Sequence, residues 1–132
     1  MKIQASAEDY LEAIWILSQK LGKVRSKDLV AHMNYAKPTI SIIVKKFKDN
    51  GYITIEDERY ITLTEKGAEI AQRIHQRHVL LSQVLIALGV NEKQAYEDAC
   101  KIEHAISEES YTCIKAHFEK WVPPTGDATK SQ

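Results

Sequence analysis

The chain has 132 residues, 44% of them hydrophobic, which suffices for one domain or two small ones with ordinary cores. Its 18 basic and 18 acidic residues cancel, so the net charge does not indicate any class of binding partner. Two cysteines exclude a disulfide framework, and neither a signal-peptide core nor a membrane-span-length apolar run is present. We therefore expect a cytoplasmic protein with reduced thiols and no membrane partner.

The first third of the chain has the pattern of two helices. Apolar residues recur at helical spacing from Tyr10 to Leu21, with Ser6 placed as the N-cap and Gly22 ending the run. Ser26 can cap a second, short helix that ends near residue 33. Both predictions rest on cap chemistry and apolar spacing alone.

A third helix and a hairpin follow. Pro38 suits the first turn of a helix, where its missing N–H costs nothing, and Asn50 with Gly51 ends that helix. Residues 52–55 and 60–63 are rich in β-branched and aromatic side chains and are separated by a polar stretch, which is typical of two short strands. Three helices and a hairpin predict a winged helix-turn-helix, the unit that places a helix in a DNA major groove.

The second half of the chain has the pattern of three more helices. We predict them at 64–88, at 91 to about 106 and at 107 to about 121, separated at Gly89 and capped by Ser107. The residues from 123 onward contain consecutive prolines, and we expect them to be disordered. The fold class is therefore mainly α, with domains at 1–72 and 73–122 and a tail at 123–132.

Basic residues gather in the predicted helix-turn-helix although the whole chain is neutral. Between Lys20 and Lys48 one acid, Asp28, stands among basic residues at positions 20, 23, 25, 27, 37, 45, 46 and 48. Such units also serve as protein-interaction modules, but clustered cations favour DNA, since phosphate neutralisation supplies much of DNA affinity.

The segment from Cys100 to His104 carries the chain's most specific chemistry. In a helix, Cys100, Glu103 and His104 would share one face, because positions three and four apart are neighbours. Thiolate, carboxylate and imidazole are ligands for divalent first-row metals. A packed cysteine beside a solvated Glu-His pair is the alternative, and this segment alone does not decide between them.

Five ordered motifs resemble the diphtheria toxin repressor/MntR family of metal-activated repressors, in the short form without an SH3-like domain. They are Glu8–Glu12, Lys37–Ser41, Leu63–Gly67, Arg77–Leu81 and Ile102–His104. The resemblance covers residues 6 to about 118. It implies an N-terminal winged helix-turn-helix followed by an α-helical metal-binding and dimerisation domain.

The resemblance also implies a set of metal ligands. They are Asp9 and Glu12 in the first helix, His78 in the long helix, and Cys100, Glu103 and His104 in the next one. Cys100 stands where the iron-sensing branch has cysteine, whereas Asp9 stands where that branch usually has methionine. The chain thus mixes two patterns. We expect Fe²⁺, slightly favoured over Mn²⁺, with Zn²⁺ third.

The implied partners are a second copy of the chain and a palindromic double-stranded DNA operator, with no small-molecule substrate. The expected DNA-contacting residues are Lys37, Pro38, Thr39, Ser41, Ile42, Lys45, Lys46 and Arg59. Ile42 stands where iron-branch relatives have a glutamine, and its side chain could at most touch a thymine methyl group. The operator sequence of those relatives therefore does not carry over to this protein.

The function expected from the resemblance is metal-dependent repression of metal-homeostasis genes, and two other functions are alternatives to it. A di-iron enzyme would need two Glu-x-x-His motifs, which the sequence lacks, and no other catalytic pattern is present. We therefore expect no enzyme. A winged-helix regulator that ignores metals, with structural Cys100 and His104, is the remaining alternative.

Overall fold

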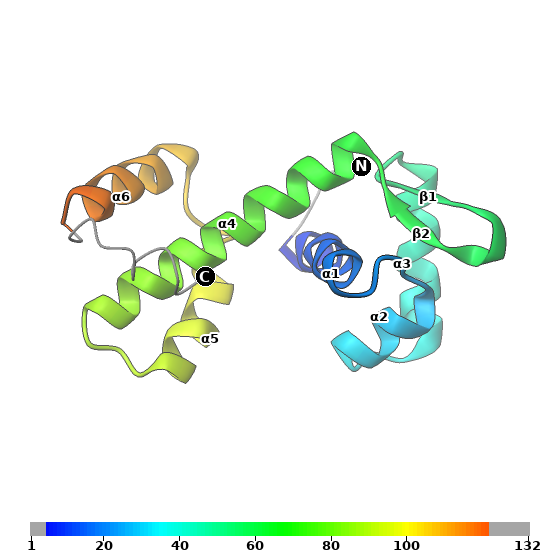
Figure 1. The fold of residues 1–132 in the computed structure, drawn as a ribbon, viewed down its shortest axis with the longest axis horizontal. Helices are drawn as coiled ribbons and strands as arrows, with labels where there is room; N and C mark the ends of the chain where they lie inside the picture. The colour runs from blue at the N-terminus through cyan, green and yellow to red at the C-terminus, as the bar shows by residue number, and fades with distance from the viewer. Residues whose placement is uncertain (1–4, 122–132) are drawn as a thin grey trace. The chain divides into compact units, whose positions relative to one another are not determined.

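The computed structural model describes residues 5–121, which form two compact units with the boundary between Ile74 and His75 (Figure 1). We describe each unit by itself. Within residues 5–121, no helix combines the length and the apolar character needed to cross a membrane. The tail predicted at 123–132 lies outside the described residues.

The first unit begins with three helices: α1 (Ala5–Leu21), α2 (Ser26–Met33) and α3 (Lys37–Asp49). The structure corrects two predicted caps. Ser6 lies inside α1, which already includes residue 5, and Ser26 is the first residue of α2 rather than its cap. Arg25 is the cap residue, and its N–H donates to the Asp28 carboxylate at 2.9 Å. The carboxylate thus accepts the N–H of the cap residue itself, which is the reciprocal half of a capping box, whereas we expected a hydroxyl to accept an N–H of the first turn.

The predicted hairpin is present as two strands, β1 (Ile53–Ile55) and β2 (Ile61–Leu63). They pair antiparallel, with Ile53 opposite Leu63 and Ile55 opposite Ile61. The Ile61 N–H also donates to the Val24 carbonyl at 2.7 Å, which attaches the hairpin to the segment before α2. The winged helix-turn-helix predicted from the sequence is thus confirmed.

The core of this unit fixes α3 by its inner face. Ile40, Val44 and Phe47 are buried, and Phe47 lies edge-on to both Tyr10 and Tyr52. Buried aromatic pairs of this kind add stability beyond the area that they bury. The opposite face of α3 stays exposed as a result of this packing.

The long helix α4 (Glu65–Ala87) has a tightly packed glycine, Gly67, in its first turn. The Thr64 hydroxyl accepts the Gly67 N–H at 3.2 Å and lies 2.7 Å from the Gly51 carbonyl, to which it donates. Gly67 is buried, and a Cβ there would collide with the Tyr52 carbonyl oxygen. That oxygen accepts the Thr64 N–H at 3.1 Å, so it is not free to move away.

We expect Gly67→Ala to lower the free energy of unfolding by about 1–3 kcal/mol, the usual cost of overpacking a close contact. Urea denaturation followed by circular dichroism measures this change. Glu69→Ala, at an exposed site of the same helix, is the control and should stay within about 0.5 kcal/mol of the parent. Equal stability of Gly67→Ala and the control would contradict the prediction.

The second unit contains the later part of α4, then α5 (Glu92–Ile102) and α6 (Glu108–Trp121). Asn91 and Ser107 cap the two shorter helices through their side chains, accepting the N–H groups of Lys93 and Ser110 at 3.0 Å each. Gly89, with φ of 104°, follows the end of α4. These boundaries agree with the predictions except at the end of α5, which stops at residue 102 instead of about 106.

Candidate metal centre and DNA-binding face

The early end of α5 changes how its metal-ligand candidates are presented. Cys100 lies in the last turn of the helix, and Glu103 is the C-cap residue, whose N–H still donates to the Ala99 carbonyl at 2.9 Å. His104 follows in the turn. The prediction that the helix continues to about residue 106 is therefore wrong, and of the three only Cys100 lies within the helix itself.

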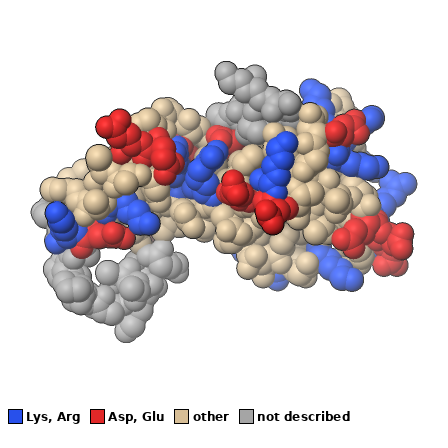
Figure 2. Space-filling view, turned by 90° about the horizontal axis from the view of Figure 1, so that it is seen from above, with Lys and Arg blue, Asp and Glu red and all other residues tan. Residues whose placement is uncertain are grey.

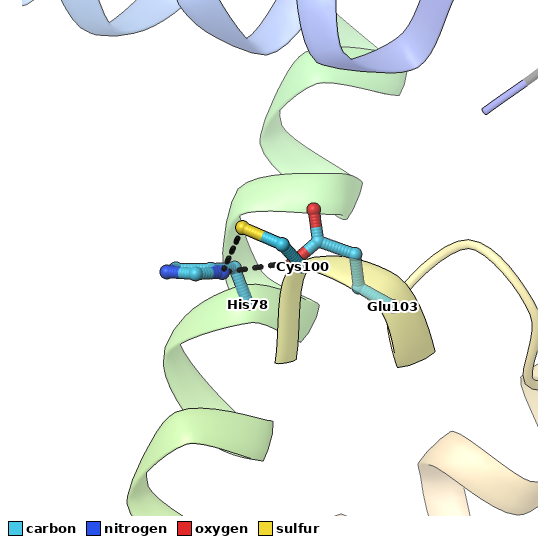
Figure 3. A group of neighbouring side chains, drawn as sticks. All are labelled: His78, Cys100 and Glu103. Atoms are coloured by element: carbon cyan, nitrogen blue, oxygen red, sulfur yellow. Dashed lines mark hydrogen bonds and ion pairs between the residues drawn. The ribbon is translucent and has the colours of Figure 1, made fainter. Parts of the chain in front are cut away.

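Three candidate ligands nevertheless converge within the second unit. His78 reaches from α4 toward Cys100 and Glu103 (Figure 3), with its Nδ1 2.9 Å from the Glu103 Oε1 and 3.7 Å from the Cys100 Sγ. One donor atom from each of these residues lies within 4.8 Å of the other two. Ligands of one ion lie at most about 4–5 Å apart, twice a bond of roughly 2.0–2.3 Å, so the cluster is compact enough for a shared cation.

The Glu103 carboxylate is the unusual member of this cluster. Its side chain has 0% exposure, and it has an imidazole near each oxygen: His78 at 2.9 Å and His104 at 3.4 Å. An isolated buried carboxylate is costly, so such a group needs a positive partner. A divalent cation held by the carboxylate, imidazole and thiolate would supply that charge, and the donor set therefore fits a transition metal.

The remaining predicted ligands belong to the other unit. Asp9 and Glu12 lie three residues apart on α1, both partly buried, and so project from one side of that helix. The structure thus brings three of the six predicted ligands into one cluster in the second unit, with His104 against Glu103. The inclusion of Asp9 and Glu12 stays a prediction.

The outer face of α3 presents most of the residues predicted to contact DNA. All seven candidates on this helix are exposed: Lys37, Pro38, Thr39, Ser41, Ile42, Lys45 and Lys46. Lys45 pairs with Asp49 at 3.0 Å, but both side chains are more than half exposed, so water and salt screen this pair. The face can therefore offer its cations to a phosphate backbone.

The tip of the hairpin carries the eighth candidate, Arg59, in a 3₁₀ turn at residues 57–59. Glu58 and Arg59 both have positive φ, at 64° and 65°, which non-glycine residues seldom adopt. Arg59 is exposed and follows three acidic residues at positions 56–58. The tip therefore presents one cation beside negative charge, and we expect a weaker attraction to DNA here than at α3.

A second basic cluster lies where the hairpin meets the start of α2. The Lys23 Nζ and the Arg25 guanidinium lie 4.9 and 4.5 Å from the centre of the Tyr60 ring, and Lys27 lines the same pocket. The basic stretch between residues 20 and 48 indicated these cations, but no sequence pattern pointed to Tyr60. Figure 2 shows basic and acidic side chains interspersed on the visible face, so any attraction to DNA must be local.

Comparison with known proteins gives consistent matches along the chain. Residues 2–61 match the model of the iron dependent repressor N-terminal DNA binding domain. Residues 64–121 match the model of the iron dependent repressor metal binding and dimerisation domain. The two matches follow one another in the same order as the two units.

The individual proteins that the chain resembles include transcriptional regulators and a solved repressor. An uncharacterized HTH-type transcriptional regulator of Methanocaldococcus jannaschii is 36% identical over 118 residues, covering 88% of this chain and 94% of that protein. The regulator MntR of Geobacillus thermodenitrificans is 38% identical, covering 77% of this chain and 72% of that protein. A solved manganese-dependent transcriptional repressor in complex with manganese is 31% identical with a TM-score of 0.72, covering 84% of this chain. The chain spans about half of that solved protein, 51% of its length.

Proposed function

Because the chain belongs to the iron-dependent repressor family, the family of the diphtheria toxin repressor and MntR, we propose that it represses transcription in response to a divalent metal ion. This is a family of DNA-binding regulators rather than enzymes, in agreement with the prediction of no catalytic activity. The proposed targets are metal-homeostasis genes, and the proposed partners are operator DNA and a second copy of the chain.

One observation carries the metal dependence: the Glu103 carboxylate, fully buried, lies between His78 and His104 and near the Cys100 thiol. We propose His78, Cys100, Glu103 and His104 as ligands, completed by Asp9 and Glu12 of the first unit. When bound, the ion supplies positive charge and ligand bonds. Since the ion would then be held by ligands from both units, the free energy of metal binding would help to order one unit relative to the other.

For the ion, we propose Fe²⁺ slightly ahead of Mn²⁺, with Zn²⁺ third. Support for iron comes from Cys100, because thiolate is a softer ligand than the carboxylates that suit manganese. Support for manganese comes from Asp9 and Glu12 and from the manganese regulators among the relatives. The preference between Fe²⁺ and Mn²⁺ therefore depends on Cys100.

Replacing Cys100 by aspartate should shift this preference. A hard oxygen ligand in place of sulfur is expected to raise the ratio of Mn²⁺ to Fe²⁺ affinity about tenfold. Competition with a metal-binding dye, under anaerobic conditions for Fe²⁺, measures both affinities. Cys113→Ser, at the other exposed cysteine, is the control: it removes a thiol without adding a charge and should leave the ratio unchanged. An unchanged ratio in Cys100→Asp would remove the thiol from the site.

The DNA and dimer proposals rest on different surfaces. The exposed face of α3 would enter the major groove, with two copies of it set by the dimer on a palindromic site. In the second unit, an apolar groove lined by Val84, Leu88, Ile114 and Phe118 is available to a second copy. Ala95 and Ala99 of α5 are buried within the chain and do not belong to this surface.

The proposed function is tested by fluorescence anisotropy with DNA from the protein's own promoter. Fe²⁺, Mn²⁺ and Zn²⁺ are titrated separately, with EDTA as the metal-free reference. We expect DNA affinity to rise with metal, and by linkage DNA must raise metal affinity by the same factor. Equal DNA affinity in EDTA and in every metal would instead favour the metal-independent winged-helix regulator.

A further inference from the structure

Arg77, the residue before His78 on α4, makes an unusual set of contacts. The residue is only 8% exposed, and its Nη1 donates to the carbonyl oxygens of Glu103 at 3.1 Å and Ile106 at 2.9 Å. The Nη2 pairs with the Glu108 carboxylate at 2.9 Å. One guanidinium thus holds both ends of the turn between α5 and α6.

Two consecutive residues of α4 therefore contact Glu103, one at its main-chain carbonyl and the other at its side-chain carboxylate. Arg77 binds the main-chain carbonyl, while His78 contacts the side-chain carboxylate at 2.9 Å. The position and the rotation of Glu103 relative to α4 are both fixed by this pair of contacts. Arg77 itself reaches none of the candidate ligand atoms in these contacts, so its influence on them passes through the backbone of the turn.

The turn has a physical need for such a donor. The last carbonyls of a helix have no partner within the helix, and α5 ends at residue 102 with Glu103 as its cap. Arg77 satisfies the Glu103 carbonyl there, and the fixed fork of a guanidinium can serve several acceptors at once. A lysine could place only a point charge among the same three oxygens.

The charge of Arg77 is also balanced locally. Its guanidinium lies 5.3 Å from the centre of the Tyr111 ring and is paired with Glu108 in the first turn of α6. A lone cation beside a proposed metal site would repel the incoming ion. With Glu108 as its counter-ion, Arg77 can fix the turn at a smaller electrostatic cost to metal binding.

We propose that Arg77 is a positioning residue for the metal centre, one that sets the placement of Glu103 and His104 opposite His78 without touching the ion. This inference rests on the proposed metal site. Loss of a residue that orients a ligand typically costs about 10- to 100-fold in metal affinity. We expect that loss from Arg77→Met and a smaller one from Arg77→Lys.

The test is a Co²⁺ titration of the full chain and its variants, read by visible absorption and by the thiolate charge-transfer band. Band positions and intensities report ligand geometry, which a general loss of stability does not change in a folded protein. Glu108→Gln is the matched control: it removes the ion pair but leaves the two carbonyl contacts of Arg77. Circular dichroism and thermal unfolding in EDTA establish that each variant is folded.

We expect weaker Co²⁺ binding and altered bands in folded Arg77→Met, with partial recovery in Arg77→Lys. In Glu108→Gln we expect parent-like bands and only a small loss of affinity, because the Glu108 side chain is 69% exposed and water screens its charge. Parent-like affinity and spectra in both Arg77 variants would overturn the proposal. So would loss of the folded second unit in both, since Arg77 would then be a general structural support. If the parent chain binds no Co²⁺, Mn²⁺ or Fe²⁺, the proposed function itself fails. That result differs from both outcomes that overturn the role of Arg77, because in those the parent chain still binds metal.

Discussion

Glu103→Gln is expected to abolish activation of DNA binding by metal. The amide keeps the volume of the side chain and can still hydrogen-bond to an imidazole, but it removes the negative charge. Metal affinity should therefore fall by more than the roughly 10- to 100-fold typical of losing a supporting residue. Isothermal titration with Mn²⁺, and anisotropy of operator DNA with and without metal, measure the two effects.

The fold of this variant should survive, because its buried group becomes neutral. An unpaired buried charge is what makes carboxylates costly inside proteins, and the amide carries none. Glu97→Gln, at an exposed position of α5, changes the net charge equally and serves as the control. If Glu103→Gln responds to metal as the Glu97→Gln control does, the ion is held elsewhere.

Replacing Lys37, Lys45 and Lys46 together by alanine is expected to remove most of the DNA affinity of the metal-loaded protein. All three are exposed on α3, where they can neutralise phosphates. Each neutralised phosphate contributes about 0.9 to the slope of log affinity against log salt. The slope, measured by anisotropy over a range of salt concentrations, should fall by up to about 0.9 for each lysine that contacts DNA.

The matched control replaces three exposed lysines of the second unit, Lys93, Lys101 and Lys115. It produces the same change in net charge at positions away from the proposed DNA-binding face. We expect its salt slope to stay close to that of the parent, and metal affinity in the absence of DNA should persist in the α3 variant. Equal slopes for the two triple variants would mean that α3 does not bear the phosphate contacts.

The elements that the sequence predicted correctly are those that depend on neighbouring residues. Asn91 and Ser107 cap their helices because each side chain reaches N–H groups two or three residues ahead. The buried face of α3 follows from apolar residues repeated at helical spacing. The predictions of Ser6 and Ser26 as caps are wrong: Ser6 lies inside α1, and α2 has Arg25 as its cap residue, whose N–H donates to the Asp28 carboxylate.

The candidate metal site likewise has features that local sequence predicts and features that depend on distant residues. Residue types and the family resemblance predicted the candidate ligands, but not that α5 would end before His104. That boundary coincides with the contacts of Arg77, whose partners Glu103 and Ile106 are 26 and 29 residues away in the chain. Nothing local in the sequence marks such a contact, because its energy depends on two elements that meet only after folding.

The order and type of the elements, the winged helix-turn-helix and the ligand types available for a metal thus follow from the sequence alone. Local spacing, caps and turn residues are sufficient for these, since they act over a few residues. Three features depend on the folded arrangement instead: the burial of the Glu103 carboxylate between two imidazoles, the contacts of Arg77 with the turn, and the positions of Lys23 and Arg25 over the Tyr60 ring. Burial and long-range pairing arise from packing between distant segments, and no local pattern encodes them.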